Sequence, residues 1–147
     1  MKYPKVIDCF DGNYGFLSNF YETPVTYGGV MYRNSEAAYQ AQKDPTRQME
    51  FVDLPANKAK RLGRKVDPVA DWDDIKYNHM LQIVRRKFHQ NPRLAEKLIQ
   101  TGEAEIIEGN RWNDTYWGVC EGKGQNKLGN ILMQIRNELK QGGNSLC

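Results

Sequence analysis

The segment RWNDTYWG (residues 111–118) places one acidic side chain, Asp114, among aromatic rings. The glycine-rich turn GKGQN (residues 122–126) follows it and opens the last apolar-striped stretch of the chain. Aromatic faces can stack a planar base, and the exposed N–H groups of a helix start can hold a phosphate. A carboxylate in such a place can stabilise a cation or move a proton. Together the two segments predict a nucleotide site.

Glu36 is the second acidic candidate, because it falls in the first turn of a helix that we expect to begin at Asn34 or Ser35. Catalysis would need Glu36 and Asp114 to face one substrate. A structural interpretation stays open for each of them. The helix macrodipole favours a carboxylate at the position of Glu36, and residues 113–115 are typical of an Asx turn.

Other side chains in polar loops could contact a ligand. Asn19 lies between the rings of the segment FLSNF (residues 16–20), and Trp72 precedes the third predicted helix. A single aromatic residue usually belongs to a core, but several in polar loops indicate a ligand surface. The turn at 122–126 matches neither the Rossmann nor the Walker pattern, so a flexible entry to the last helix explains it equally well. A basic cluster is typical of a solvated face and could also hold a phosphate: Lys58, Lys60, Arg61, Arg64 and Lys65.

A hairpin and five helices must position these residues. Strand-forming residues flank Gly28-Gly29, which predicts a hairpin over residues 25–32 with a tight primed turn. Apolar spacing, capping residues, glycines and prolines predict helices at residues 34–43, 55–62 (stopped by Gly63), 73–88, 91–102 and 126–140, and a short strand at 104–108. The predicted fold class is α+β: a compact, mainly helical single domain with one small antiparallel sheet. It spans residues 1–147, with a frayed tail from about residue 141.

Composition and charge exclude several classes of protein. The 147 residues are 39% hydrophobic and 27% charged, which is ordinary globular usage. A net charge of +3 gives no strong basic signal for nucleic acid. No run approaches the roughly 18 apolar residues of a membrane span, and the first residues do not form a secretion signal. We therefore expect a cytoplasmic protein, a monomer or weak oligomer.

The metal-binding residue types are sparse and scattered. Cys9, Cys120 and Cys147 form no CxxC pair, so we expect reduced thiols and neither a disulfide nor a zinc framework. His79 and His89 have no acidic or cysteine partner at ligand spacing. The sequence therefore predicts no metal site.

Several motifs together resemble one known family. In order and spacing, FLSNF (16–20), NSEAAYQAQK (34–43), LGR (62–64), DW (71–72), residues 80–88, NDTYWG (113–118) and GKGQNKLG (122–129) are similar to the NADAR superfamily of YbiA-like N-glycosidases. The resemblance covers roughly residues 8–140. It implies a YbiA-like α+β fold and hydrolysis of an N-glycosidic bond without a metal or organic cofactor. The family's substrates are phosphoribosylated aminopyrimidine intermediates of riboflavin synthesis, or ADP-ribose attached to guanine in DNA.

The resemblance also implies roles for particular residues. Glu36 and Asp114 match the family's acidic residues; one would activate water, and the other would stabilise charge or protonate the leaving group, in an order that the sequence leaves open. The matching positions that would bind the substrate are Asn19, Lys43, Arg64, Trp72, Trp117, Gly124 and Asn126. Two departures stand out. Ala37 replaces the family's histidine, and Asp44-Pro45 replaces an aromatic residue, which implies a reshaped pocket edge.

The expected function is hydrolysis of the N-glycosidic bond of a ribosylated base, with a small nucleotide-like molecule as the partner. A phosphoribosylaminopyrimidine or a related ADP-ribosyl compound is the expected substrate. Two alternatives stay open. One is an ADP-ribosyl-guanine DNA hydrolase, which the modest charge of +3 disfavours. The other is a non-catalytic module that binds ADP-ribose or an NAD derivative, with Ala37 as the sign of lost catalysis.

Overall fold

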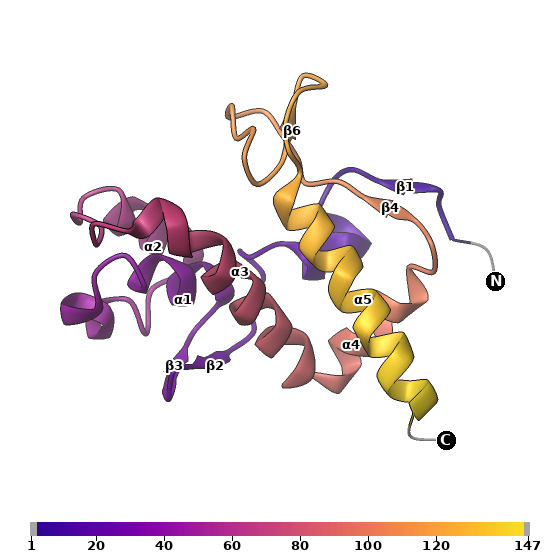
Figure 1. The fold of residues 1–147 in the computed structure, drawn as a ribbon, viewed down its shortest axis with the longest axis horizontal. Coiled ribbons are helices and arrows are strands. Elements are labelled where there is room, and N and C mark those ends of the chain that lie inside the picture. Colours follow the sequence, from indigo (N-terminus) through magenta and orange to yellow (C-terminus); the bar gives the residue numbers. More distant parts are fainter. Residues whose placement is uncertain (1–2, 146–147) are drawn as a thin grey trace. The chain divides into compact units, whose positions relative to one another are not determined.

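The computed structural model describes residues 3–145, and the side chains of residues 3–142. The chain forms two compact units. The middle unit is one continuous segment, Asn19–Gln90, whereas the terminal unit combines Met1–Ser18 with Asn91–Cys147. Figure 1 labels the helices and strands of both units.

The middle unit consists of the predicted hairpin and three α-helices. The helices are α1 (Ser35–Ala41), α2 (Ala56–Gly63) and α3 (Trp72–His89), and a short 3-10 helix, η2 (Pro45–Glu50), follows α1. Strands β2 (Val25–Tyr27) and β3 (Val30–Tyr32) pair in antiparallel fashion, with Val25 opposite Tyr32. Gly28 and Gly29 both have positive φ, at 60° and 80°, as a primed turn requires. The hairpin and the first three helices are confirmed.

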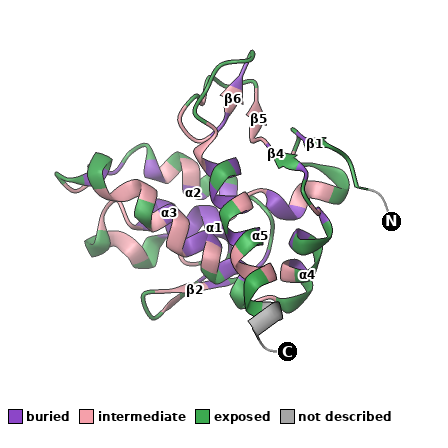
Figure 2. Ribbon diagram, turned by 45° about the vertical axis from the view of Figure 1, so that its right-hand side comes forward, coloured by how far each residue is buried: buried purple, intermediate pink, exposed green. Residues whose placement is uncertain are grey.

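Helix α1 is the buried centre of the middle unit. The Asn34 side chain caps it by accepting a hydrogen bond from the Ala37 backbone N–H. All seven residues of α1 are buried, as the purple ribbon in Figure 2 shows, and α1 contacts α2, α3 and both strands. Because Glu36 lies on this helix, its carboxylate is held inside the fold rather than on a solvated face.

Helix α2 ends at Gly63 as predicted, but the glycine is needed for helix packing and not to stop the helix. Gly63 does not have the left-handed φ that usually stops a helix, and Arg64 follows as a right-handed C-cap. A β-carbon at Gly63 would overlap the side-chain amide of Gln40, with Cδ only 2.5 Å away. The glycine therefore allows α1 and α2 to pack closely.

The terminal unit contains two longer helices and two short parallel strand pairs. Its helices are α4 (Pro92–Gln100), α5 (Lys127–Ser145) and the 3-10 helix η1 (Gly12–Leu17). Strand β1 (Val6–Ile7) pairs with β4 (Glu105–Ile106), and β5 (Gly109–Asn110) pairs with β6 (Val119–Cys120). Helix α5 packs on α4 and β4. The buried apolar side chains of these three elements are Leu94, Leu98, Ile106, Leu128, Ile131, Leu132 and Ile135.

The predicted fold class is confirmed: the chain is α+β and mainly helical, with a small antiparallel hairpin. The strand expected at residues 104–108 is present as β4, but the two parallel pairings were not predicted, because strands of two residues show no alternation of apolar and polar side chains. Helix α5 continues beyond residue 141, where we expected a frayed tail. That the whole chain forms a single domain stays a prediction.

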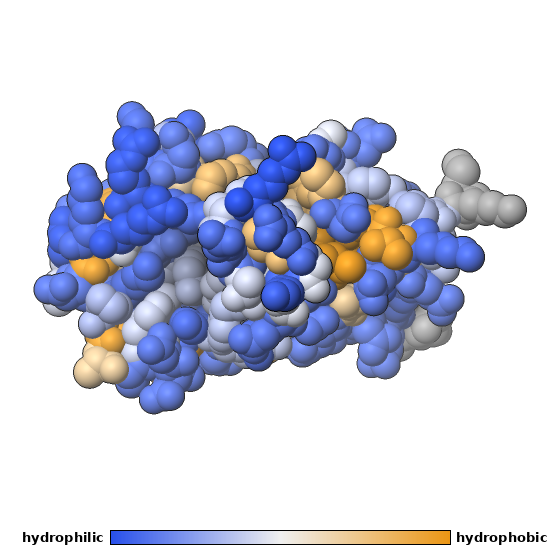
Figure 3. All heavy atoms as spheres, turned by 90° about the horizontal axis from the view of Figure 1, so that it is seen from above, coloured by the Kyte–Doolittle hydropathy of each residue, from blue (hydrophilic) through white to orange (hydrophobic). Residues whose placement is uncertain are grey.

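The described part of the chain adds observations on thiols, membrane spans, metal ligands and surface hydropathy. Cys9 and Cys120 are free thiols, while Cys147 lies outside the described residues. Within residues 3–145, no helix is long and apolar enough to span a bilayer, and no group of three or more potential ligands could hold a metal ion. In Figure 3 hydrophobic side chains form separate patches among hydrophilic ones.

Candidate functional site

The carboxylate of Glu36 is buried and hydrogen-bonded. Its side chain is only 8% exposed, and its Oε2 accepts a hydrogen bond of 2.6 Å from Nε2 of Gln40, one helical turn further along α1. The backbone N–H of Glu36 donates to the carbonyl oxygen of Asn19 at 3.1 Å. A buried carboxylate is costly unless it is hydrogen-bonded, so the amide of Gln40 both stabilises and orients it.

Lys43 brings a half-buried cation close to Glu36. Its Nζ donates to the carbonyl oxygen of Gly63 at 3.2 Å. Burial lowers the pKa of Lys43, the negative charge of Glu36 acts in the opposite direction, and the positive charges of Arg64 and Lys76 lower the pKa further. The charges of both Glu36 and the exposed Arg64 therefore act on Lys43.

Asn19 supplies an unsatisfied acceptor beside this cluster. The residue is 7% exposed, and its Nδ2 donates to the Met80 sulfur at 3.2 Å. Its Oδ1 is buried and has no hydrogen-bond partner among the described residues. Such a buried acceptor is rare unless water or a ligand supplies the donor, which agrees with the predicted binding role of Asn19.

Trp72 is packed against other rings of the middle unit. It is 8% exposed, its ring centroid lies 5.3 Å from that of Tyr39, and it stacks on His79 at 6.1 Å with an angle of 22°. His79 in turn shares a 2.8 Å hydrogen bond with the Tyr27 hydroxyl through Nδ1. Burial lowers the pKa of His79, although Asp71 opposes this, so the neutral ring is favoured. Neighbouring rings thus already contact Trp72, and its role in stacking a base stays a prediction.

Asp114 forms the Asx turn that was the structural alternative for this residue. Its Oδ1 accepts hydrogen bonds from the backbone N–H groups of Tyr116 at 3.2 Å and Trp117 at 2.9 Å. The side chain of Asn110 accepts from the N–H of Asp114 and donates to its carbonyl oxygen. These bonds fix the orientation of the carboxylate. They do not by themselves exclude a catalytic role, because Oδ2 takes no part in them.

At the start of helix α5, the expectation of exposed amides is wrong for residues 125–128. Four consecutive N–H groups, of residues 125–128, donate to the carbonyl oxygens of residues 115–118 at 2.7–3.3 Å. The side chain of Asn126 is also engaged, because its Oδ1 accepts from the N–H of Glu108 and its Nδ2 donates to the carbonyl oxygen of Ile106. Asn126 therefore holds two backbone segments together.

Gly124 is required by the path of the backbone. Its φ is +151°, and an added β-carbon would overlap the carbonyl oxygen of Gly118 and lie 2.9 Å from Cα of Val119. The ring of Trp117 is half-buried and meets Tyr116 edge-on at 4.7 Å. Gly124 and Asn126 thus have structural roles that account for their presence, and their predicted contacts with substrate stay untested.

The predicted residues divide between the two units. Glu36, Asn19, Lys43, Arg64 and Trp72 belong to the middle unit, whereas Asp114, Trp117, Gly124 and Asn126 belong to the terminal unit. That Glu36 and Asp114 act on one substrate stays a prediction.

The sequence analysis did not identify Gln40 as the hydrogen-bond partner of Glu36, or Gly63 as the residue that leaves room for Gln40. Gln40 lies four residues after Glu36, so helical spacing could have placed the two side chains on one face. The need for Gly63 follows from the packing of α1 against α2 and has no local signal.

Comparisons with known proteins agree on one family. The NADAR domain matches residues 9–140. A riboflavin biosynthesis protein of Vibrio vulnificus is 43% identical over 137 residues, which cover 89% of this chain and 37% of that protein. N-glycosidase YbiA of Escherichia coli is 37% identical over 134 residues, which cover 86% of this chain and 82% of YbiA. The NMR structure of Escherichia coli YbiA is similar with a TM-score of 0.82 at 33% identity, over 95% of this chain and 88% of that one.

Proposed function

This chain belongs to the NADAR domain family, and we propose that it is an N-glycosidase that hydrolyses the bond between a ribosyl group and a base. The resemblance seen in the sequence is confirmed. Relatives named N-glycosidase occur in Escherichia coli and in a mimivirus, and a further relative is named a riboflavin biosynthesis protein. These names support a glycosyl-bond hydrolase, and the substrate that we propose is the phosphoribosylated aminopyrimidine expected from the family resemblance.

The observation that carries this proposal is the buried, oriented carboxylate of Glu36 with a cation beside it. In the reaction, the oxygen of water bonds to C1 of the ribose, the bond from C1 to the base nitrogen breaks, and the base leaves with a proton. Positive charge develops at C1 and the ring oxygen on the way. Glu36 would accept one proton of the attacking water, and Asp114 would stabilise the positive charge. The leaving base would take its proton from solvent, to which Glu36 would then return the proton that it accepted. This order is part of the proposal.

Lys43 and Arg64 give the middle unit its affinity for an anionic substrate. Glu36 and Arg64 both act electrostatically on Lys43, and a 5′-phosphate on the ribose would neutralise the two cations. Asn19 would accept a hydrogen bond from a ribose hydroxyl through its unsatisfied Oδ1. The start of α5 takes no part, because the N–H groups of residues 125–128 are engaged.

The test is to incubate the purified protein with a phosphoribosylated aminopyrimidine and measure the free base by HPLC. Glu36→Gln should keep the fold and lower base release by about 10²–10⁴-fold, the usual effect of losing a general base. Glu96→Gln, an exposed change on α4, is the matched control and should leave the rate unchanged. Equal rates for wild type and Glu36→Gln would end the assignment.

A parallel reaction with DNA that carries ADP-ribosylated guanine separates the substrate classes. Base release from the DNA alone would contradict the proposed substrate but not the reaction. Binding of ADP-ribose without release from either substrate would contradict the reaction and favour the binding module.

A further inference from the structure

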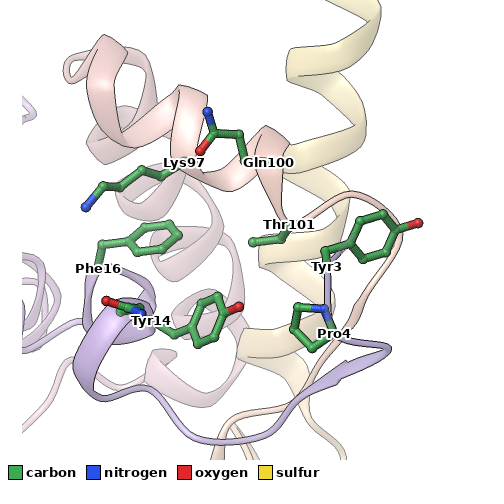
Figure 4. A pocket seen from close by; sticks show the side chains of 8 residues that line it. Tyr3, Pro4, Tyr14, Phe16, Lys97, Gln100 and Thr101 are labelled. Carbon is green, nitrogen blue, oxygen red and sulfur yellow. The ribbon is translucent and has the colours of Figure 1, made fainter. Parts of the chain in front are cut away.

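The terminal unit contains a cavity that shares no residue with the proposed site. Its volume is about 630 Å³, within the range of small-molecule pockets. Figure 4 shows the lining side chains around an open space. They are Tyr3, Pro4, Asn13, Tyr14, Phe16, Lys97, Gln100 and Thr101. All of these residues belong to the terminal unit, so the cavity is defined within one compact body.

Aromatic rings and one cation form the walls. Tyr14 and Phe16 project from η1 into the space, and Tyr3 and Pro4 lie across it in Figure 4. The Nζ of Lys97 lies 5.6 Å from the centroid of the Phe16 ring, in a cation–π contact. An aromatic surface with an ammonium group beside it suits a planar ring that carries negative charge.

Two further cations support the back of the cavity. The Oγ1 of Thr101 accepts a hydrogen bond of 2.9 Å from Nη1 of Arg136, and Nζ of Lys140 donates to the carbonyl oxygen of Gly102 at 2.8 Å. Arg136 is 8% exposed; burial lowers its pKa, while Tyr3 and Glu103 oppose this effect. Glu103 is thus an acidic group whose charge partly offsets that of Arg136. An arginine stays charged in proteins, so the positive charge behind the cavity is permanent.

The wall formed by Tyr3 depends on a glycine. Gly102 has a φ of +66°, and an added β-carbon would overlap the Tyr3 ring, with Cζ 2.5 Å away. The ring therefore lies directly against the backbone of Gly102, whose carbonyl oxygen is held by Lys140. The Tyr3 ring and the backbone of Gly102 thus hold each other in place, so the packing of the unit itself shapes this wall of the cavity.

The geometry points to a second ligand site in this cavity, for a planar ring that carries an anionic group and has the size of a mononucleotide. The ring stacks against Tyr14 and Phe16, and the anion pairs with Lys97. The side-chain amides of Asn13 and Gln100 supply donors and acceptors for the edge of the ring. This site is independent of the N-glycosidase proposal, because it uses none of the residues assigned to hydrolysis.

The test is an NMR titration of the ¹⁵N-labelled protein with AMP, adenosine and inorganic phosphate in parallel. AMP should shift the backbone amides of residues 13–16 and 97–101, and should bind more tightly than adenosine or phosphate. Lys97→Met keeps a long, unbranched side chain but removes its charge, and should weaken AMP binding about tenfold, as the loss of one charged contact does. Lys123→Met, in an exposed turn of the same unit, is the control and should change nothing.

Three outcomes would overturn the assignment. If AMP shifts only residues 19–90, the cavity is not the site that it binds. If wild type and Lys97→Met bind AMP equally, the anion does not pair with Lys97. If phosphate alone binds as tightly as AMP, no ring is recognised. None of these results bears on base release by Glu36, which the HPLC assay measures separately.

Discussion

Replacing Gly63 by alanine should reduce catalysis without unfolding the protein. The new β-carbon would overlap the side-chain amide of Gln40, the far end of a flexible side chain, so this amide must move. In moving it loses the 2.6 Å hydrogen bond that it donates to Oε2 of Glu36. A hydrogen bond to a charged group contributes about 1.5–3 kcal/mol, and about 1.4 kcal/mol corresponds to tenfold in rate. We therefore expect kcat to fall by about 10- to 100-fold.

The stability of the variant should change much less than its activity. Alanine favours a helix over glycine by about 1 kcal/mol, which offsets part of the repacking. The assay is base release measured by HPLC, together with thermal unfolding followed by circular dichroism. Gly15→Ala is the matched control, because a β-carbon at Gly15 meets nothing within 4 Å. It should leave both kcat and the unfolding temperature close to those of the wild type.

A double variant tests whether the effect passes through Gln40. Gln40→Ala removes the donor to Glu36 and should lower kcat by a similar factor. Adding Gly63→Ala to Gln40→Ala should then lower kcat no further, because the two changes act on one hydrogen bond. The reasoning fails if the two effects multiply, or if both single variants keep the wild-type rate.

Three further predictions concern stability and the loop of Asp114. Lys87 is 1% exposed, and burial lowers its pKa to about 7. Between pH 7 and about 10 the unfolded state therefore binds more protons than the folded state, so the free energy of unfolding should rise with pH in this range. Urea unfolding should show a smaller rise for Lys87→Met than for the wild type. Asp114→Asn keeps an acceptor oxygen for the Asx turn, so its stability should equal that of the wild type. It should release the base about 10²–10⁴-fold more slowly in the HPLC assay. A near-normal rate would exclude catalysis by Asp114. Gly124→Ala should lower stability by about 2 kcal/mol or more in a urea titration, because its φ of +151° and the nearby Gly118 carbonyl exclude a side chain; an unchanged midpoint would contradict this.

The sequence predicted those parts of the fold that depend on local patterns. The cap at Asn34, the paired glycines of the hairpin and the turn at Gly102 each follow from the chemistry of a few neighbouring residues, and the structure has all three. The fold class and the family followed in the same way, because the motifs keep their order along nearly the whole chain.

Tertiary contacts decided what the sequence could not. The sequence at the start of α5 is typical of an anion site. In the structure, however, its N–H groups donate to the carbonyl oxygens of residues 115–118, and no local signal predicts such a contact. The Asx turn at Asp114 was one of two open interpretations, and only the hydrogen bonds of its Oδ1 identify it. The hydrogen bond between Gln40 and Glu36 could have been predicted from the sequence, because a residue four places after Glu36 lies on the same face of the helix.

The discontinuous terminal unit has a consequence for how the chain folds as it is synthesised. Strand β1 cannot form its hydrogen bonds until β4 has been synthesised, because Val6 pairs with Glu105, the first residue of β4. Residues 19–90 form a contiguous body that is complete before that partner leaves the ribosome. We therefore expect the segment that carries Glu36 to become compact first, while β1 stays unpaired until β4 has been made.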